Sequence, residues 1–241
     1  MNLMNDNSKN PPKIKIEGKP KYINIGNDQD FFELFRKIEK SFSNCFLFES
    51  LGEESNISRY HIIGFDPKYL VYAENKSELI LENTTSAKKY KYTCENPYLK
   101  LRNIIPQNVI SRKYAGGLVG FISYDSINYF ENSLNIKKNK NFECFKFGIF
   151  LDGLIYDQMT GEIFYYFYEE SRIAEIEKIL NKKFSFNKSV KTKFLRDSMT
   201  KEEHKKTVLK IKNDIKNGLI FQCEVGFKSH YEIEGDLTEI Y

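Results

Sequence analysis

Three short polar stretches stand beside apolar runs, and their side chains could contact a small ligand. Glu49 and Ser50 end a compact apolar run, and Ser123–Asp125 directly follows a glycine-rich one. Gln222 lies in a run where apolar and polar residues alternate. A carboxylate and a hydroxyl at the mouth of a buried strand can receive a small polar ligand. Each stretch is also compatible with a strand end or strand face that meets water.

The cysteines and histidines form no metal-binding pattern. The four cysteines, Cys45, Cys94, Cys144 and Cys223, are far apart without a C-x-x-C pair, and the chain has three histidines. Zinc and iron–sulfur sites need closely spaced ligands of these types. We therefore expect reduced, buried cysteines and no zinc or iron–sulfur site encoded in this sequence.

Length and composition predict a globular protein with one large domain or two small ones. The 241 residues are 41% hydrophobic and 15% aromatic, enough for a substantial core. The net charge of +4 comes from 37 basic and 33 acidic residues mixed along the chain, which argues against nucleic-acid binding. The sequence has no run of about 18 apolar residues and no apolar core of a signal peptide. We expect a cytoplasmic protein that does not bind membranes.

Helix and strand signals alternate along the first three quarters of the chain. Residues 1–20 are polar and contain prolines, so we expect a disordered N-terminal tail. Asp28 or Asp30 can cap a helix to about Lys40, because apolar residues recur on one face. Further predicted helices are Pro97–Ile104 and Glu169–Leu180. Predicted strands are Lys21–Ile25, Asn44–Ser50, Arg59–Pro67, Tyr69–Ala73, Glu78–Leu81, Lys89–Thr93, Phe145–Asp157 and Glu162–Tyr168, the last two joined as a hairpin.

The stretch GGLVGFISYD, residues 116–125, predicts a strand of an unusual kind. Gly116, Gly117 and Gly120 allow the backbone to approach another element closely or to adopt a positive φ. Such a strand is normally buried on both faces. The polar residues Ser123–Asp125 would then point from its end at a specific contact.

The last part of the chain changes character. The basic segment Asn181–Arg196 has little periodicity and is the predicted linker. Thr200 and Glu203 form a capping box that begins an amphipathic helix. From Phe221 to Tyr231 apolar and polar residues alternate, which predicts a strand with Gln222 on its polar face.

Four strings resemble those of component I of anthranilate synthase and its chorismate-using relatives. They are NCFLFES at 44–50, RYHIIGFDP at 59–67, GGLVGFISYD at 116–125 and KNDIKNGLIFQCEVG at 212–226. They occur in the family's order, and the resemblance covers about residues 28–241. It agrees with the strand pattern in implying an α+β fold rich in antiparallel sheet, with two sheets arranged like a sandwich and flanking helices.

The resemblance also implies a domain division. Residues 21–190 correspond to the N-terminal domain of component I, and residues 197–241 to the start of its chorismate-binding domain. The Mg²⁺-binding glutamates of relatives lie beyond the position that matches Tyr241, and no acidic cluster in this sequence replaces them. We therefore expect a truncated chain without synthase activity of its own, and no metal ligands within it.

In this family, component I binds chorismate and Mg²⁺, adds ammonia to C2 of the ring and eliminates pyruvate to leave anthranilate. A glutamine amidotransferase subunit supplies the ammonia. Similar isochorismate synthases carry a lysine at the position of Gln222, where it can deprotonate an attacking water. Ammonia is already a nucleophile and needs no such base. The neutral Gln222 is thus consistent with an aminating enzyme and with a positioning role in the active site.

Glu49 and Ser50 match the family's L-L-E-S motif, whose serine contacts the feedback inhibitor tryptophan. Leu47 and Phe48 then occupy the two leucine positions, and the phenyl ring could narrow the pocket. The resemblance implies that the hydroxyl and carboxylate receive the inhibitor's ammonium group, while apolar neighbours surround the indole.

Two departures limit what the resemblance carries over. Gly226, Phe227 and Lys228 stand where the family usually has S-Q-R, and Asn128 stands where an arginine is common. Two other functions stay open. One is component I of 4-amino-4-deoxychorismate synthase, which shares these strings, and the other is a stand-alone regulatory module that binds tryptophan without catalysis.

Overall fold

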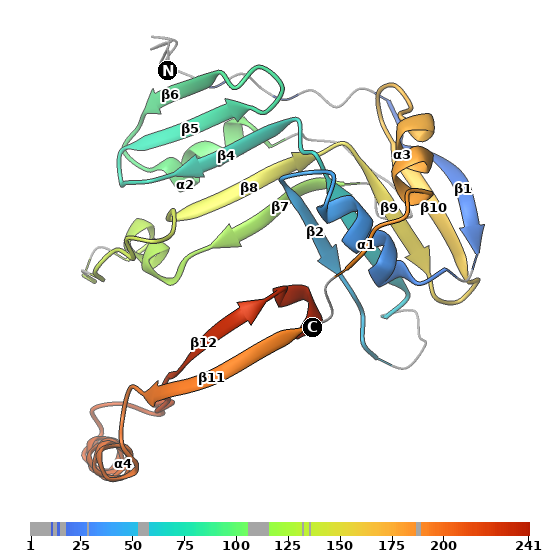
Figure 1. Cartoon of the computed structure of the whole chain (residues 1–241). Helices are drawn as coiled ribbons and strands as arrows, with labels where there is room; N and C mark the ends of the chain where they lie inside the picture. Colours follow the sequence, from blue (N-terminus) through green and yellow to red (C-terminus); the bar gives the residue numbers. More distant parts are fainter. Residues whose placement is uncertain are drawn as a thin grey trace. The chain divides into compact units, whose positions relative to one another are not determined.

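The computed structural model describes residues 11, 14, 18–27, 29–52, 58–105, 116–131, 133–134, 136–186 and 189–241. The chain divides into two compact units, Met1–Lys182 and Lys183–Tyr241. Within the described residues the first unit holds two five-stranded sheets and the second a two-stranded sheet (Figure 1). Every described helix is too short or too polar to span a bilayer.

One sheet of the first unit has the strand order β1-β10-β9-β3-β2. Its strands are β1 (Lys21–Asn27), β2 (Cys45–Phe48), β3 (Tyr60–Phe65), β9 (Asp152–Asp157) and β10 (Glu162–Phe167). The predicted strand Lys21–Ile25 is confirmed as β1, which lies at one edge of this sheet. The predicted β9–β10 hairpin is also confirmed, with Asp157 opposite Glu162 across the turn.

Two helices, α1 (Phe31–Glu39) and α3 (Ile173–Leu180), cover a face of this sheet (Figure 1). Asp30 caps α1, because its Oδ1 accepts a hydrogen bond from the Glu33 N–H (3.1 Å), whereas Asp28 lies outside the described residues. Their apolar faces and the sheet form one core, which includes Phe31, Leu34, Ile38, Ile63, Leu154, Tyr165 and Ile176.

The other sheet has the order β6-β5-β4-β8-β7. Its strands are β4 (Tyr69–Ala73), β5 (Glu78–Asn83), β6 (Lys89–Thr93), β7 (Gly117–Ile122) and β8 (Phe145–Phe150). The three predicted strands from Tyr69 to Thr93 are confirmed as β4, β5 and β6, which pair in sequence order as an antiparallel meander. The short helix α2 (Pro97–Lys100) continues into the 3-10 helix η1 (Leu101–Asn103), and the core here includes Val71, Leu79, Leu81, Ile104 and Phe145.

All strand pairs in both sheets are antiparallel. The predicted fold class, an α+β protein rich in antiparallel sheet with flanking helices, is therefore confirmed. Most of the predicted tail, residues 1–20, lies outside the described residues. Ile14 is described and is buried in the core of the sheet that contains β4.

The prediction of one strand over Phe145–Asp157 is wrong. The chain bends at Leu151, so that β8 belongs to one sheet and β9 to the other. The Tyr168 N–H donates a hydrogen bond to the Leu151 carbonyl (3.2 Å). This bond satisfies a carbonyl group that belongs to neither strand at the bend. The connection between β3 and β4 also crosses from one sheet to the other. It passes close to the bend, because the Lys68 N–H donates a hydrogen bond to the Ile149 carbonyl (3.0 Å). Two crossings thus meet at one corner.

Arg172 joins the two chain segments that cross between the sheets at this corner. Its guanidinium donates two hydrogen bonds to Asp152 at the start of β9 (3.0 and 2.9 Å) and one to Asp66 in the β3–β4 connection (2.7 Å). The Tyr165 hydroxyl donates to the same Asp152 carboxylate (2.9 Å). Burial raises the pKa of Asp152, against the hydrogen bonds from Arg172 that lower it. The carboxylate therefore depends on Arg172 as its counter-charge.

β7 is an edge strand, so the prediction of a strand buried on both faces is wrong. Among the described strands β7 pairs with β8 alone, and Phe121 and Ile122 are exposed. The predicted close approach of its glycines is confirmed, because a Cβ on Gly120 would collide with the Lys146 carbonyl oxygen. Gly120 thus serves the pairing of β7 with β8, whereas Gly117 has open space around it and adopts a positive φ.

The second unit consists of β11 (Val190–Asp197), α4 (Lys201–Lys216), β12 (Ser229–Gly235) and the 3-10 helix η3 (Leu237–Glu239). The predicted capping box is confirmed, because Thr200 Oγ1 accepts from the Glu203 N–H (3.2 Å) and Glu203 Oε2 accepts from the Thr200 N–H (2.7 Å). The predicted linker Asn181–Arg196 is wrong in its second half, which forms β11.

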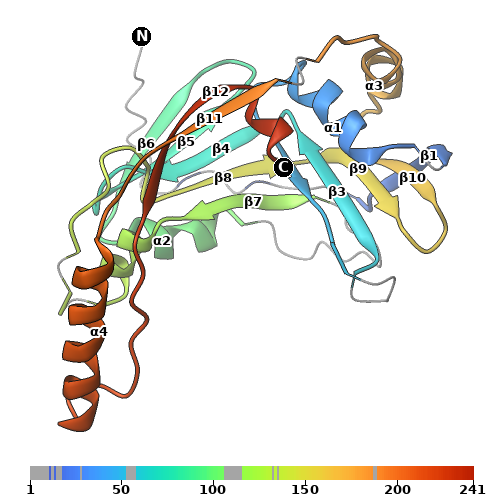
Figure 2. The same ribbon diagram turned by 60° about the horizontal axis from the view of Figure 1, so that its bottom comes forward.

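The predicted strand Phe221–Tyr231 is also wrong, because β12 begins only at Ser229. β12 pairs with β11 from Ser229 opposite Asp197 to Gly235 opposite Val190. Residues 221–228 run back beside α4 in an extended path (Figure 2), where His204 Nε2 lies 3.1 Å from the Val225 carbonyl oxygen. Alternation alone therefore located a strand about eight residues too early.

Replacing Arg172 by alanine is expected to lower the free energy of unfolding by about 3 kcal/mol, because it leaves the Asp152 carboxylate buried without a counter-charge. Protonation of Asp152 removes that cost, so the deficit should shrink as the pH falls from 7 toward 4. Urea unfolding of the full chain at both pH values measures it.

The control is Lys68→Ala, which removes the more exposed ion pair with Glu169 at the same corner and should cost less than about 1 kcal/mol. Equal losses in the two variants, or a deficit in the Arg172 variant that is independent of pH, would show that the corner does not rest on Arg172.

Candidate functional site

The end of β2 carries the two residues predicted to contact an amino-acid inhibitor. β2 pairs with β3 as far as Phe48 opposite Ile62, and Glu49 and Ser50 continue the chain toward His61 and Tyr60. Glu49 Oε1 lies 3.3 Å from His61 Nδ1, and Ser50 Oγ donates a hydrogen bond to the Tyr60 carbonyl (3.3 Å). The structure thus places the predicted carboxylate and hydroxyl side by side at one strand end.

His61 is the group that faces Glu49. The two side chains are 13% and 12% exposed, and the rings of Phe31 and Tyr156 pack edge-on against the imidazole. The contact has the distance of an ion pair without the alignment of a hydrogen bond. It is charged on both sides only when His61 is protonated. With a neutral imidazole, the Glu49 carboxylate is open to another cation such as an ammonium group.

Gln158 ties this strand end to the β9–β10 turn. Its side-chain amide donates hydrogen bonds to the carbonyl oxygens of Ser50 (3.0 Å) and Ser58 (2.8 Å). The same nitrogen lies within hydrogen-bonding distance of His61 Nε2. One amide therefore joins the chain before and after the connection between β2 and β3, and it holds the backbone of Ser50 in place.

An ion pair between Arg59 and Asp157 lies at the start of the same turn. Arg59 donates two hydrogen bonds to Asp157, from Nε (2.9 Å) and Nη2 (2.6 Å), and the Asp157 side chain is almost fully buried. Hydrogen bonding to Asp157 raises the pKa of the Arg59 guanidinium. A fixed, bidentate pair of this kind sets the orientation of the residues on either side.

The groups described at this strand end suit the binding of a small polar ligand. The thiol nearest to this strand end in β2 is Cys45, and burial raises its pKa to about 11. It is therefore protonated at neutral pH and is a poor nucleophile. Glu49 and Ser50 offer a carboxylate and a hydroxyl, which suit the ammonium and carboxylate groups of an amino acid.

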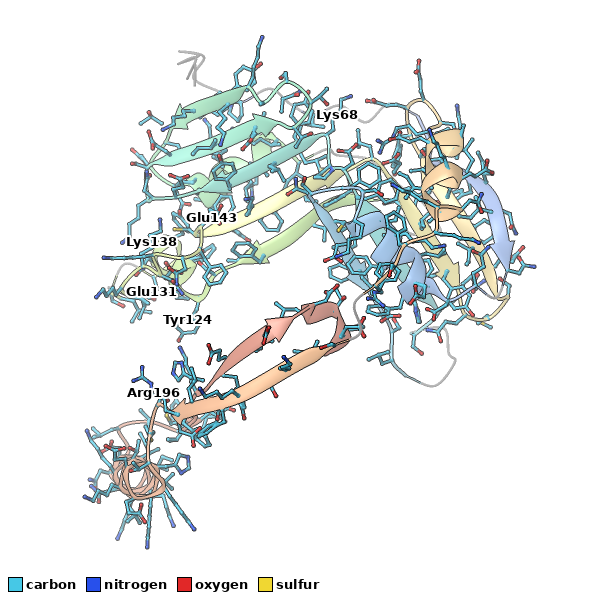
Figure 3. All side chains as sticks on the ribbon, in the orientation of Figure 1. Lys68, Tyr124, Glu131, Lys138, Glu143 and Arg196 are labelled. Atoms are coloured by element: carbon cyan, nitrogen blue, oxygen red, sulfur yellow. The ribbon has the colours of Figure 1, made fainter. Side chains whose placement is uncertain are left out.

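The polar run after β7 has an internal structural role. Ser123 Oγ donates to the Cys144 carbonyl (2.8 Å), and Asp125 Oδ2 accepts from the Asn139 N–H (3.2 Å). Together they pin the 3-10 helix η2 (Tyr124–Tyr129) to the loop before β8. Tyr124 instead projects away from the sheet and is 85% exposed (Figure 3). Of the three residues Ser123–Asp125, Tyr124 is thus the one for which a contact with another molecule stays a prediction.

Asn128, which stands where an arginine is common, closes the same loop. Its side chain donates to the carbonyls of Asp125 (2.9 Å) and Ile136 (2.8 Å) and accepts from the Ile136 N–H (3.0 Å). The departure from the family's usual residue therefore has a local explanation, because the amide satisfies backbone groups on both sides of the loop.

Gln222 lies in the second unit, in the extended segment between α4 and β12. Its side chain is exposed, and the segment is not part of a strand. The structure therefore groups Glu49 with Ser50 in the first unit and holds Gln222 in the second. The assignment of Gln222 as a positioning residue stays a prediction.

A cavity of about 510 Å³ lies at the corner, away from Glu49 and Ser50. Its charged groups are largely paired with one another, as in Lys68–Glu169 (2.5 Å) and Arg172–Asp152 (2.9 Å). We therefore read this cavity as part of the corner and do not assign a ligand to it. Within the described residues, no group of three or more His, Cys, Asp or Glu side chains could hold a metal ion. The Mg²⁺ implied by the resemblance stays a prediction.

Comparison with known proteins identifies the family. Residues 43–241 match the model of the family described as chorismate binding enzyme. The chain belongs to this family. It is 40% identical over 235 residues to anthranilate synthase component 1 of Leptospira biflexa, covering 95% of this chain and 49% of that protein. It is 30% identical over 233 residues to the protein of that name from Methanothermobacter thermautotrophicus, covering 97% of this chain and 47% of that protein.

The chain spans about half the length of the curated relatives it matches. A solved structure gives the same proportion: anthranilate synthase component I from Streptococcus pneumoniae TIGR4 matches 78% of this chain and 45% of its own, with a TM-score of 0.56 and 20% identity. That likeness supports the fold. The resemblance read from the four sequence strings is thus confirmed at the level of the family.

The sequence does not predict the roles of His61 and Gln158. Both belong to strings or turns that were recognised, but neither residue has a local signal for its role. Aligning NCFLFES with RYHIIGF as an antiparallel pair would have placed Glu49 opposite His61, had the register been known. The contact of Gln158 spans about a hundred residues, so only the folded chain reveals it.

Replacing Gln158 by alanine is expected to loosen the end of β2, because two carbonyl oxygens lose their donor. Two such bonds contribute about 1 to 3 kcal/mol, so amide exchange at residues 50–52 and 58–60 should accelerate by roughly five- to a hundredfold. Hydrogen–deuterium exchange with mass spectrometry measures this. The matched control, Gln222→Ala, should leave amide exchange at these residues unchanged. An unaltered exchange rate in the Gln158 variant would show that the Gln158 side chain does not hold the end of β2.

Proposed function

We propose that this chain forms part of an anthranilate synthase component I, which converts chorismate and ammonia to anthranilate and pyruvate. In this reaction ammonia adds to C2 of the ring, the ring hydroxyl leaves as water and the enolpyruvyl group leaves as pyruvate. Membership of the family and the names of its similar relatives support the proposal. Those names also favour it over 4-amino-4-deoxychorismate synthase.

The observation that carries the proposal is an apolar surface that the second unit does not cover by itself. One face of the β11–β12 hairpin pairs Phe194 with Tyr231 and Thr192 with Ile233. Phe194 and Tyr231 are 53% and 54% exposed. The opposite face carries charged pairs, Lys191–Glu234 (3.6 Å) and Lys193–Glu232 (3.8 Å). A hairpin with one charged and one apolar face is built to lie with the apolar face on a core.

The helix of this unit has the same property. Val208, Ile211 and Ile215 recur at helical spacing along α4, and none of the described residues in 183–241 is buried. Isolated two-stranded hairpins are marginally stable in water, and helices gain most of their stability from packing of an apolar face. We propose that a further polypeptide, equivalent to the part of the relatives that this chain does not match, covers these faces and completes the enzyme. We call it the complementary polypeptide.

In the completed enzyme we assign Gln222 a positioning role toward the ring or its nucleophile. Its amide has both donors and an acceptor but does not titrate, so it can orient a substrate without removing a proton. That property suits ammonia, which attacks without a general base. We further propose that a glutamine amidotransferase subunit delivers the ammonia and that the complementary polypeptide holds Mg²⁺.

We propose that the strand end with Glu49 and Ser50 binds tryptophan as a feedback inhibitor. Glu49 would receive the ammonium group in place of His61, and Ser50 Oγ would contribute a hydrogen bond. The backbone there is held by Gln158, so the two groups are oriented before a ligand arrives.

The reaction is tested by co-expressing this chain with the part of the Leptospira biflexa relative that it does not match. With chorismate, Mg²⁺ and ammonium, the purified pair should produce anthranilate fluorescence, and this chain alone should produce none. In the pair, Gln222→Ala should lower kcat by roughly a hundredfold because the reacting groups lose their alignment. The control, Gln29→Ala, should not change kcat.

Two results would contradict the proposal. Anthranilate formed by this chain alone would rule out a shared enzyme. A stable pair that consumes no chorismate would rule out the reaction.

Inhibition is tested on the same active pair. Ser50→Ala is expected to raise the tryptophan concentration for half-inhibition by roughly tenfold, the equivalent of about one lost hydrogen bond to a charged or polar ligand. The activity without tryptophan should stay the same. Ser41→Ala, which removes a serine hydroxyl bonded within the turn after α1, is the matched control. Unchanged inhibition in the Ser50 variant would remove this residue from the inhibitor site.

A further inference from the structure

Among the described residues, the two sheets of the first unit end in four edge strands, and one of these strands lacks features that oppose pairing with another chain. The edges are β1 and β2 in one sheet and β6 and β7 in the other. Exposed edges pair readily with other chains, so proteins blunt them with charged residues, bulges or very short strands. An unblunted edge of some length is therefore a place where another strand belongs.

Three of the four edges are blunted. β1 has a bulge between Asn24 and Gly26, and β6 carries Lys89 and Lys91. β2 is only four residues long. Each of these features opposes the addition of a further strand.

β7 has none of these features. It is six residues long, has the uncharged sequence GLVGFI and pairs with β8 in an unbroken register. The Ser123 N–H donates to the Cys144 carbonyl on the β8 side (2.8 Å). Alternation along the strand then turns the backbone N–H and C=O groups of Ile122, Gly120 and Leu118 away from β8. This edge offers a ladder with no partner among the described strands.

An apolar surface adjoins this edge. It consists of Phe121, Ile122, Tyr124 and Phe142, which we call the β7 edge surface, and all four side chains are exposed. A cavity of about 360 Å³ lies among three of them, lined by Phe121, Tyr124 and Phe142 together with residues of the loop before β8. The hydrogen bonds of Ser123 and Asp125 hold this loop, so the surface is preformed.

We propose that the β7 edge surface is where the complementary polypeptide adds a strand to the sheet. Main-chain hydrogen bonds to the free ladder would give affinity, and an apolar side chain in the cavity would give specificity. The occupant follows from length, because relatives contain about as many residues again as this chain matches. This inference rests on the proposed function, since it names the partner of the same enzyme.

Co-purification after co-expression tests the proposal. The tagged full chain and the unmatched part of the Leptospira biflexa relative are expressed together, and their ratio is measured after affinity capture. Wild type should retain the partner at one to one. Ile122→Lys places a charge on the edge and should reduce retention more than about tenfold. Met159→Lys is the matched control, because it charges a similarly exposed residue (53% against 48%) in the β9–β10 turn.

Both variants should keep the thermal unfolding midpoint of wild type, which shows that exposed positions were changed without loss of fold. Equal retention by the Ile122 variant and wild type would overturn the proposal, as would failure of wild type to retain the partner. Sedimentation velocity of the chain alone examines a rival occupant: dimers that Ile122→Lys abolishes would identify a second copy on this edge. Retention without anthranilate production would support this interface while contradicting the proposed reaction.

Discussion

The part-buried contact between Arg172 and Asp152 is the constraint on which the first unit depends. The chain crosses between the two sheets twice, and both crossings meet where this pair lies. The Arg172 guanidinium also stacks on the rings of Phe42 and Phe65, so it joins the corner to the core beneath α1. Burial alone would lower the pKa of Arg172, but its hydrogen bonds with Asp152 and Asp66 raise it overall. Arg172 therefore stays charged and keeps its ion pairs with Asp152 and Asp66.

The corner and the proposed inhibitor site lie at opposite ends of the same strands. Asp66 follows the last residue of β3, whereas His61 lies near its start, and Asp152 and Asp157 mark the two ends of β9. A slip of one residue would turn every side chain of these strands to the other face. Asp66 and Asp152, which Arg172 joins, lie beside the last pair of the β3–β9 register, Gly64 opposite Gly153, so the corner favours that register.

Two kinds of surface in this chain are unsuited to water. The β7 edge has an unprotected ladder beside exposed aromatic residues, and the second unit has amphipathic elements without a core. Both features have the same physical meaning, because apolar area and unpaired backbone groups are stabilised only when other polypeptide covers them. They agree with a family whose relatives are about twice as long as the region matched here.

The sequence by itself determined the features that depend on neighbouring residues, and the family. Asp30 and Thr200 cap their helices through bonds to residues three positions away, and the β9–β10 turn closes within four residues. The tertiary structure alone decided the bend at Leu151, the edge position of β7 and the pairing of β11 with β12. It also decided the contacts of His61 and Gln158. These features depend on strands and side chains far apart in sequence, and hydrophobic alternation does not say which strand will be the partner or in which register.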